Sequence, residues 1–134
     1  MSHSNLEILA YEKTPLGDLC LRRRELLSRP GTVITEITLD HQLLMSSYNT
    51  VSERALAKEA LERHTGHDLS VLVGGLGLGY TAQAALDDER VRSLYVIDAL
   101  AEVIGWHRDH LVPLGAELTA DPRCQLVHGD FFAM

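Results

Sequence analysis

Apolar and β-branched residues in the first third of the chain occur in short runs separated by turn residues. Residues 6–11 and 19–22 flank a proline- and glycine-containing turn signal at residues 14–18, and together they predict a β-hairpin. Residues 32–39 are rich in Val, Ile and Thr and predict a further strand. This part of the chain is therefore expected to form a small β-rich subdomain.

The pattern changes near residues 46–50, where it becomes an alternation of helices and strands. The expected elements are a helix at 52–63, a strand at 69–73, a helix at 81–86, a strand at 94–97, a helix at 99–111 and a strand at 124–128. Such alternation is typical of an α/β fold, in which crossover helices cover a parallel sheet. We therefore expect an N-terminal β-strand and hairpin subdomain at residues 1–48. A Rossmann-like three-layer half, acting as a nucleoside-binding domain, is expected at residues 49–134.

The charge balance restricts the kind of ligand. The chain has 12 Lys and Arg against 19 Asp and Glu, which gives a net charge of −7 at pH 7. Because nucleic-acid binding needs clustered positive charge, we expect no nucleic-acid partner. A short basic run, Arg22, Arg23 and Arg24, is interpreted as a solvated edge of the predicted hairpin, since charges on an edge strand oppose aggregation.

Cysteine usage and hydropathy indicate a cytoplasmic protein. Cys20 and Cys124 are far apart and lack CxxC spacing, so they predict neither a disulfide framework nor a zinc site. His107 and His110 are interpreted as surface or packing residues, because no thiol or carboxylate set completes a metal site, and we expect no metal. The N-terminal residues lack the apolar run of a secretory signal. No stretch reaches the roughly 18 apolar residues of a membrane helix, so no membrane partner is expected.

Residues suited to binding a ligand follow each of the three predicted parallel strands. The first strand leads into a glycine-rich turn with Gly75, Gly77 and Gly79, the second ends at Asp98, and the third leads into Asp130. In doubly wound sheets the ligand lies outside the carboxyl ends of the strands. Glycines allow close approach of a ligand to the backbone, and carboxylates accept hydrogen bonds from ribose hydroxyls and exocyclic amines. These five residues are the predicted nucleoside-binding residues, with Asp98 on the ribose and Asp130 on the adenine.

The spacing of the glycines argues against a dinucleotide. Starting from Gly75, the G-x-G-x-x-G fingerprint would place its last glycine at Tyr80, so an NAD-binding half-domain is disfavoured. The observed G-x-G-x-G spacing resembles the first motif of class I S-adenosylmethionine-dependent transferases.

The resemblance is specific to the spermidine synthase (polyamine aminopropyltransferase) family. The sequence VLVGGLGLG at residues 71–79 looks like that family's glycine-rich motif, and residues 95–98 with 102–104 resemble its ribose-binding strand and following helix. Residues 127–130 resemble its adenine-side Gly-Asp motif, and residues 39–42 its N-terminal strand domain. The similarity spans most of the chain and is strongest from residue 69 onward.

The resemblance implies aminopropyl transfer from decarboxylated S-adenosylmethionine to a polyamine. The family's catalytic acid follows a fourth strand beyond residue 134, so the catalytic residue is unknown, and we expect this chain to hold only the nucleoside-binding half. Leu78 stands where the family has an acid that holds the donor's amine, which leaves an S-adenosylmethionine-dependent methyltransferase relative as an alternative. A non-catalytic binding or assembly module is a third possibility.

The missing fourth strand also bears on assembly. In the resembled sheet it lies beside the first strand, so residues 69–73 would present an unpaired edge. We expect another copy, the N-terminal strands or further sequence to cover this edge, and we expect a homo-oligomer.

Overall fold

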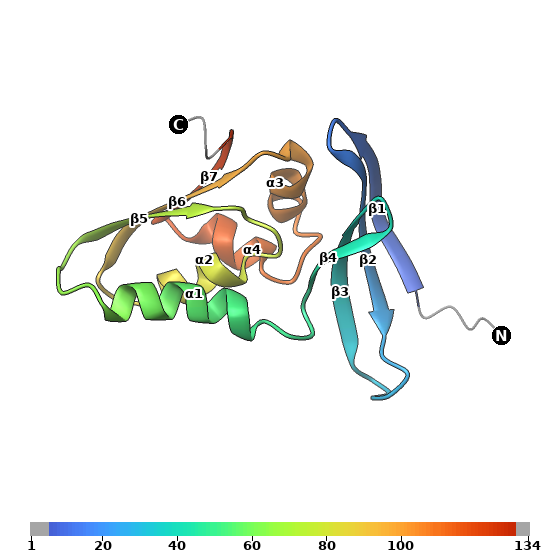
Figure 1. The fold of residues 1–134 in the computed structure, drawn as a ribbon, viewed down its shortest axis with the longest axis horizontal. Coiled ribbons are helices and arrows are strands. Elements are labelled where there is room, and N and C mark those ends of the chain that lie inside the picture. Colours follow the sequence, from blue (N-terminus) through green and yellow to red (C-terminus); the bar gives the residue numbers. More distant parts are fainter. Residues whose placement is uncertain (1–5, 131–134) are drawn as a thin grey trace. The chain divides into compact units, whose positions relative to one another are not determined.

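The computed structural model describes residues 6–130 and contains two compact units, Met1–Asn49 and Thr50–Met134 (Figure 1). The first unit contains an antiparallel sheet, and the second contains a parallel sheet with helices. The predicted α/β class, with a β-rich part before a Rossmann-like half, is confirmed. The division at residues 48 and 49 into separately folding domains stays a prediction.

The first unit is a meander whose strands pair in chain order, β1-β2-β3-β4. Its strands are β1 Leu6–Thr14, β2 Gly17–Glu25, β3 Val33–Leu39 and β4 Gln42–Ser46. The sequence pattern does not predict strand β4. Strands β3 and β4 are joined by a two-residue turn in which Asp40 and His41 have positive φ values of 49° and 70°. Two successive positive φ angles match the twist of a hairpin, but the Asp-His pair is a weak signal compared with Asn-Gly.

The interpretation of the basic run as a solvated edge is wrong. Strand β2 lies inside the sheet, and Arg22 and Arg24 both donate hydrogen bonds to Glu36 on β3, at 2.9 and 3.0 Å from Nε to Oε1. The Glu36 side chain is only 3% exposed. Burial alone would raise its pKa, but the bonds from the two arginines outweigh that effect and lower the pKa of Glu36. The arginines therefore neutralise a buried acid.

The second unit has a three-stranded parallel sheet in the order β5-β6-β7. Its elements are α1 Val51–Glu62, β5 Leu69–Gly74, α2 Tyr80–Leu86, β6 Val91–Asp98, α3 Ala101–Arg108, α4 Gly115–Ala120 and β7 Cys124–His128. The helix expected at 99–111 ends at Arg108, and the six-residue α4 was not expected because it is too short to show a helical repeat.

The core of this unit lies between the sheet and its helices. Figure 1 shows α1, α2 and α4 on one side of the sheet. Leu94 and Val96 are fully buried, and Trp106 on α3 is buried, as expected for a core residue. Leu72 and Tyr95 pair across β5 and β6 and are 54% and 43% exposed. The sheet face that carries these two residues is therefore open to solvent.

The amino-terminal ends of β6 and β7 are tied by two Asp-x-Arg clamps. Asp88 accepts hydrogen bonds from the backbone and side chain of Arg90, whose guanidinium also donates to the carbonyl of Leu61 at the end of α1. Asp121 and Arg123 repeat the arrangement before β7. The hydrogen bonds from Arg90 lower the pKa of Asp88 to about 2. Both clamps lie at the opposite ends of these strands from Asp98 and His128.

No helix of the described residues is both long enough and apolar enough to cross a membrane.

Candidate functional site

The carboxyl ends of the three parallel strands surround one open cleft of about 590 Å³. The lining residues are Gly74, Gly75, Ile97, Asp98, Ala99, Gly129 and Asp130. The strand register brings these ends together, since Gly74 pairs with Ile97 and Asp98 pairs with His128. A hydrogen bond from the Gly129 amide to the Asp98 carbonyl, 3.0 Å long, joins the second and third strand ends.

Three of the five predicted binding residues line this cleft: Gly75, Asp98 and Asp130. Gly77 is half-buried and Gly79 is buried, and neither lines the cleft. These two glycines instead shape the turn beneath it. Ligand binding by any of the five residues stays a prediction.

The Asp98 carboxylate is the centre of the site's hydrogen bonding. Its Oδ2 accepts hydrogen bonds from the amide of Leu76 at 2.9 Å and, more weakly, from the amide of Gly77 at 3.5 Å. Its Oδ1 accepts from the amide of Leu100 at 2.9 Å, just before α3. One side chain at the end of β6 thus holds both the glycine turn and the start of the next helix.

Two glycines of the turn are needed for different reasons. Gly75 has φ of +99°, and a Cβ there would meet no atom of the described residues within 4 Å, so backbone strain is what requires glycine. Gly79 has φ of +93°, and a Cβ there would lie 2.5 Å from Leu118 Cδ1 and 3.1 Å from His107 Cε1. Gly79 therefore also makes room for α3 and α4 to pack against the turn.

His107 contacts the glycine turn next to the cleft, and the sequence did not single it out for function. It is fully buried, and its Nε2 lies 2.8 Å from the carbonyl oxygen of Gly77. Burial lowers the pKa of His107, although the bond to Gly77 and the charge of Asp98 act in the opposite direction. The only sequence signal was its place on the apolar face of its helix, which predicts burial but not a bond to the turn.

Leu78 does not take part in the cleft. Its side chain is fully buried and is not among the lining residues. Its identity therefore does not discriminate between donors with and without a carboxyl group by direct contact. The methyltransferase relative stays an alternative prediction, because the buried leucine supplies no acid to hold the amine of a donor.

The electrostatics of the cleft suit a neutral or positively charged ligand. Among the residues that the structure describes, its lining contains two carboxylates, Asp98 and Asp130, and no basic side chain. A pyrophosphate would meet these charges without a cation to balance it. Among the described residues, no group of three or more His, Cys, Asp and Glu side chains is arranged to hold a metal ion.

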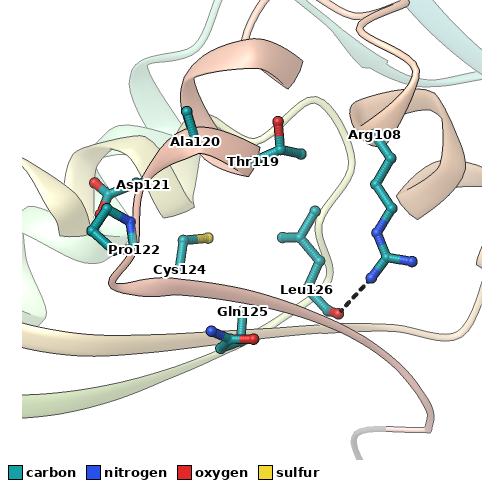
Figure 2. A pocket seen from close by; sticks show the side chains of 8 residues that line it. All are labelled: Arg108, Thr119, Ala120, Asp121, Pro122, Cys124, Gln125 and Leu126. Carbon is teal, nitrogen blue, oxygen red and sulfur yellow. Dashed lines mark hydrogen bonds between the residues drawn. The ribbon is translucent and has the colours of Figure 1, made fainter.

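A second hollow, of about 420 Å³, lies between α4, β7 and the end of α3 (Figure 2). Arg108 donates a hydrogen bond from its guanidinium to the carbonyl of Leu126, 3.4 Å away. Cys124 also lines this hollow, and burial raises the pKa of its thiol to about 11. A thiol with that pKa stays protonated near neutral pH and is a poor nucleophile. This hollow is therefore a weaker candidate than the cleft at the strand ends.

Comparison with known proteins identifies the fold. No protein-family model matches the sequence, and no curated protein matches it. The chain is similar to the crystal structure of a spermidine synthase in complex with the transition-state analogue AdoDATO, with a TM-score of 0.70 and 16% identity. It is also similar to spermidine synthase from Thermotoga maritima, with a TM-score of 0.71 and 16% identity.

These matches cover most of this chain but less than half of the neighbours. They include 91% and 92% of this chain, and 39% and 41% of the two spermidine synthase chains. At 16% identity these matches establish a shared fold alone.

Proposed function

We propose that the chain binds the nucleoside part of decarboxylated S-adenosylmethionine, as the donor-binding half of an aminopropyltransferase-like protein. One observation carries the proposal: Gly75, Asp98 and Asp130, from three separate strand ends, line a single cleft. In doubly wound folds this edge of the sheet is where ligands bind. The neighbour solved with a transition-state analogue, AdoDATO, supports a ligand of this class.

Asp98 retains the capacity to bind a ribose. A carboxylate offers about four acceptor positions. Three are used here, and the one to the Gly77 amide is long at 3.5 Å. A ribose hydroxyl can therefore donate to the remaining position on Oδ1, or replace the long bond on Oδ2. Asp130, which lines the cleft from the next strand end, would accept from the exocyclic amine of adenine.

The charge of the cleft favours a sulfonium compound over a dinucleotide. Both S-adenosylmethionine and its decarboxylated form carry a positively charged sulfur, which two nearby carboxylates attract. The carboxylate of S-adenosylmethionine would be repelled by the same charges, so the decarboxylated donor is preferred. Within residues 6–130, no cation in the lining compensates the phosphates of NAD.

The proposed reaction follows from the chemistry of that donor. The amine of a polyamine acceptor attacks the carbon next to the sulfonium, a C–N bond forms, and the C–S bond breaks. Methylthioadenosine leaves as a neutral thioether, and the ammonium product gives up a proton to an acceptor. The residues of the cleft bind and orient the donor for this attack, and the proton acceptor is not assigned.

Isothermal titration calorimetry tests the proposal. We expect methylthioadenosine to bind the full chain and decarboxylated S-adenosylmethionine to bind more tightly than S-adenosylmethionine. NAD is the control ligand and should bind weakly. Absence of heat with millimolar methylthioadenosine would overturn the proposal, and preference for S-adenosylmethionine would restore the methyltransferase alternative.

A further inference from the structure

His107 is a polar residue in an otherwise apolar position. Its side chain is fully buried, and its Nε2 is 2.8 Å from the Gly77 carbonyl oxygen. A carbonyl oxygen can only accept, so Nε2 carries the proton and donates. In the neutral ring Nδ1 is then an acceptor, and it is buried without a hydrogen-bond partner among the described residues.

An unpaired buried acceptor destabilises a folded protein. A leucine would fill a similar volume without that penalty, but it could not donate to Gly77. The bond to the turn is therefore the contribution that a histidine makes here and an apolar side chain cannot. A leucine can replace His107 in core packing but not in donating to Gly77, so comparing the two side chains separates a positioning role from core packing.

The turn is held from two sides. On one side, the Asp98 carboxylate accepts from the amides of Leu76 and Gly77. On the other side, His107 donates to the carbonyl of Gly77, and its ring edge lies against Gly79 together with Leu118. The same turn residues thus connect His107 on α3 to the carboxylate that faces the cleft.

We propose that His107 is a positioning residue that fixes the glycine turn, and through it Asp98, in the geometry that receives the nucleoside. The inference rests on the proposed function for its ligand, but its structural half applies to the ligand-free protein. Loss of the bond to Gly77 loosens the turn, so the Leu76 amide leaves the Asp98 carboxylate more often. The carboxylate then meets the ribose in more than one orientation, and affinity falls.

Two variants separate the bond from the packing. His107→Gln keeps an N–H donor at a reach similar to Nε2, whereas His107→Leu keeps the volume and removes the donor. Amide hydrogen exchange of Leu76 and Gly79 in the ligand-free protein reports on the turn, since Leu76 donates to Asp98 and Gly79 donates to Leu76. We expect at least tenfold faster exchange in His107→Leu and near wild-type exchange in His107→Gln.

Methylthioadenosine binding, measured by calorimetry on the same variants, gives the second readout. We expect at least tenfold weaker binding for His107→Leu and near wild-type binding for His107→Gln, with similar thermal unfolding midpoints.

Unchanged amide exchange in His107→Leu would overturn the proposal, as would an equal loss of affinity for methylthioadenosine in both variants. If His107→Leu does not fold, the affinity of His107→Gln for methylthioadenosine tests the proposal. A loss of affinity in this variant, which keeps the N–H donor, would contradict it. If the wild-type chain does not bind methylthioadenosine, the proposed function fails, and exchange alone still tests the role of His107 in the turn.

Discussion

Asp98 Oδ2 lies 2.9 Å from the backbone nitrogen of Leu76, a residue 22 positions earlier in the chain. This bond joins the end of β6 to the glycine turn that follows β5. Asp98 therefore shapes the ligand-free cleft and also offers acceptor positions to a ligand. A mutation at this residue is expected to affect both roles.

Asp98→Asn is expected to weaken methylthioadenosine binding by roughly tenfold to a hundredfold. The amide keeps one oxygen acceptor but loses the charge, and hydrogen bonds to a charged group contribute about 1.5–3 kcal/mol. Calorimetric titration measures the change. Glu59→Gln is the matched control, because Glu59 is an exposed acid on α1 outside the cleft. Equal affinity in the Asp98 variant and the control would contradict the assignment of Asp98 to the ribose.

Gly75→Ala and Gly79→Ala are expected to differ in stability. Both positions have positive φ, which costs an alanine about 1–2 kcal/mol. At Gly75 nothing else opposes the new methyl group, whereas at Gly79 it would lie 2.5 Å from Leu118. Overpacking adds about 1–3 kcal/mol, so the Gly79 variant should lose about 2–5 kcal/mol. Urea denaturation of the two variants checks the order, and a less stable Gly75 variant would contradict it.

Stability is expected to decrease as the pH falls below about 6.5, the ordinary histidine pKa. Burial lowers the pKa of His107 in the folded state, and Asp98 is the charged group that opposes this. Gly77 and Gly79, which lie beside the ring, carry no charge.

The unfolded chain binds a proton on His107 more readily than the folded chain does. The contribution of neutral His107 to the free energy of unfolding is therefore fully present above about pH 6.5. It is lost as the pH falls from there to the lowered folded-state pKa. The slope is at most about 1.4 kcal/mol per pH unit. Denaturation of the wild type and His107→Gln between pH 7.5 and about pH 5 isolates this contribution. An identical pH dependence for both proteins would contradict it.

Glu36→Gln is expected to destabilise the four-stranded sheet by about 1–3 kcal/mol, because Arg22 and Arg24 would lose their shared carboxylate. This lies below the roughly 3–5 kcal/mol that breaking a fully buried ion pair costs, since both arginines are about a third or more exposed. The pKa of Glu36 is lowered from 4.5, so its contribution is present above about pH 4.5 and is lost as the pH falls through the folded-state pKa. Denaturation at pH 7 and about pH 3 should show a smaller difference between variant and wild type at the lower pH.

The sequence predicts the parallel half of the fold well, because its strands are short apolar runs that end in glycine or aspartate. The cleft could be anticipated for the same reason, since the order Gly75, Asp98 and Asp130 follows the strand order. Strand β4 could not be predicted from the sequence, because the turn before it is made by Asp40 and His41, which rarely adopt positive φ together. Helix α4 begins at Gly115 and is too short for a periodic signal.

Long-range contacts explain the remaining differences. Nothing near Arg22 or Arg24 in the sequence indicates that they share Glu36, because this pairing depends on the register of β2 against β3. The bond between His107 and Gly77 likewise spans 30 residues. Local patterns can predict that His107 is buried, but not which atom it meets.

The open edge of the parallel sheet gives a prediction about assembly. Strand β5 is at an edge of its sheet, and within residues 6–130 it pairs only with β6. Leu72 and Tyr95 are exposed on the adjoining face. We expect the chain to form a homo-oligomer through this surface and Leu72→Lys to shift it toward the monomer. Size-exclusion chromatography with light scattering checks both, and a monomeric wild type would contradict this prediction.

The most direct test of the cleft is an amide NMR titration of the full chain with methylthioadenosine. We predict that the largest shift changes occur at Gly75, Leu76, Leu100 and Gly129, around the ends of β5, β6 and β7, and that Asp98→Asn greatly reduces them. Changes centred on the hollow beside Cys124, or no changes at saturating nucleoside, would contradict the account.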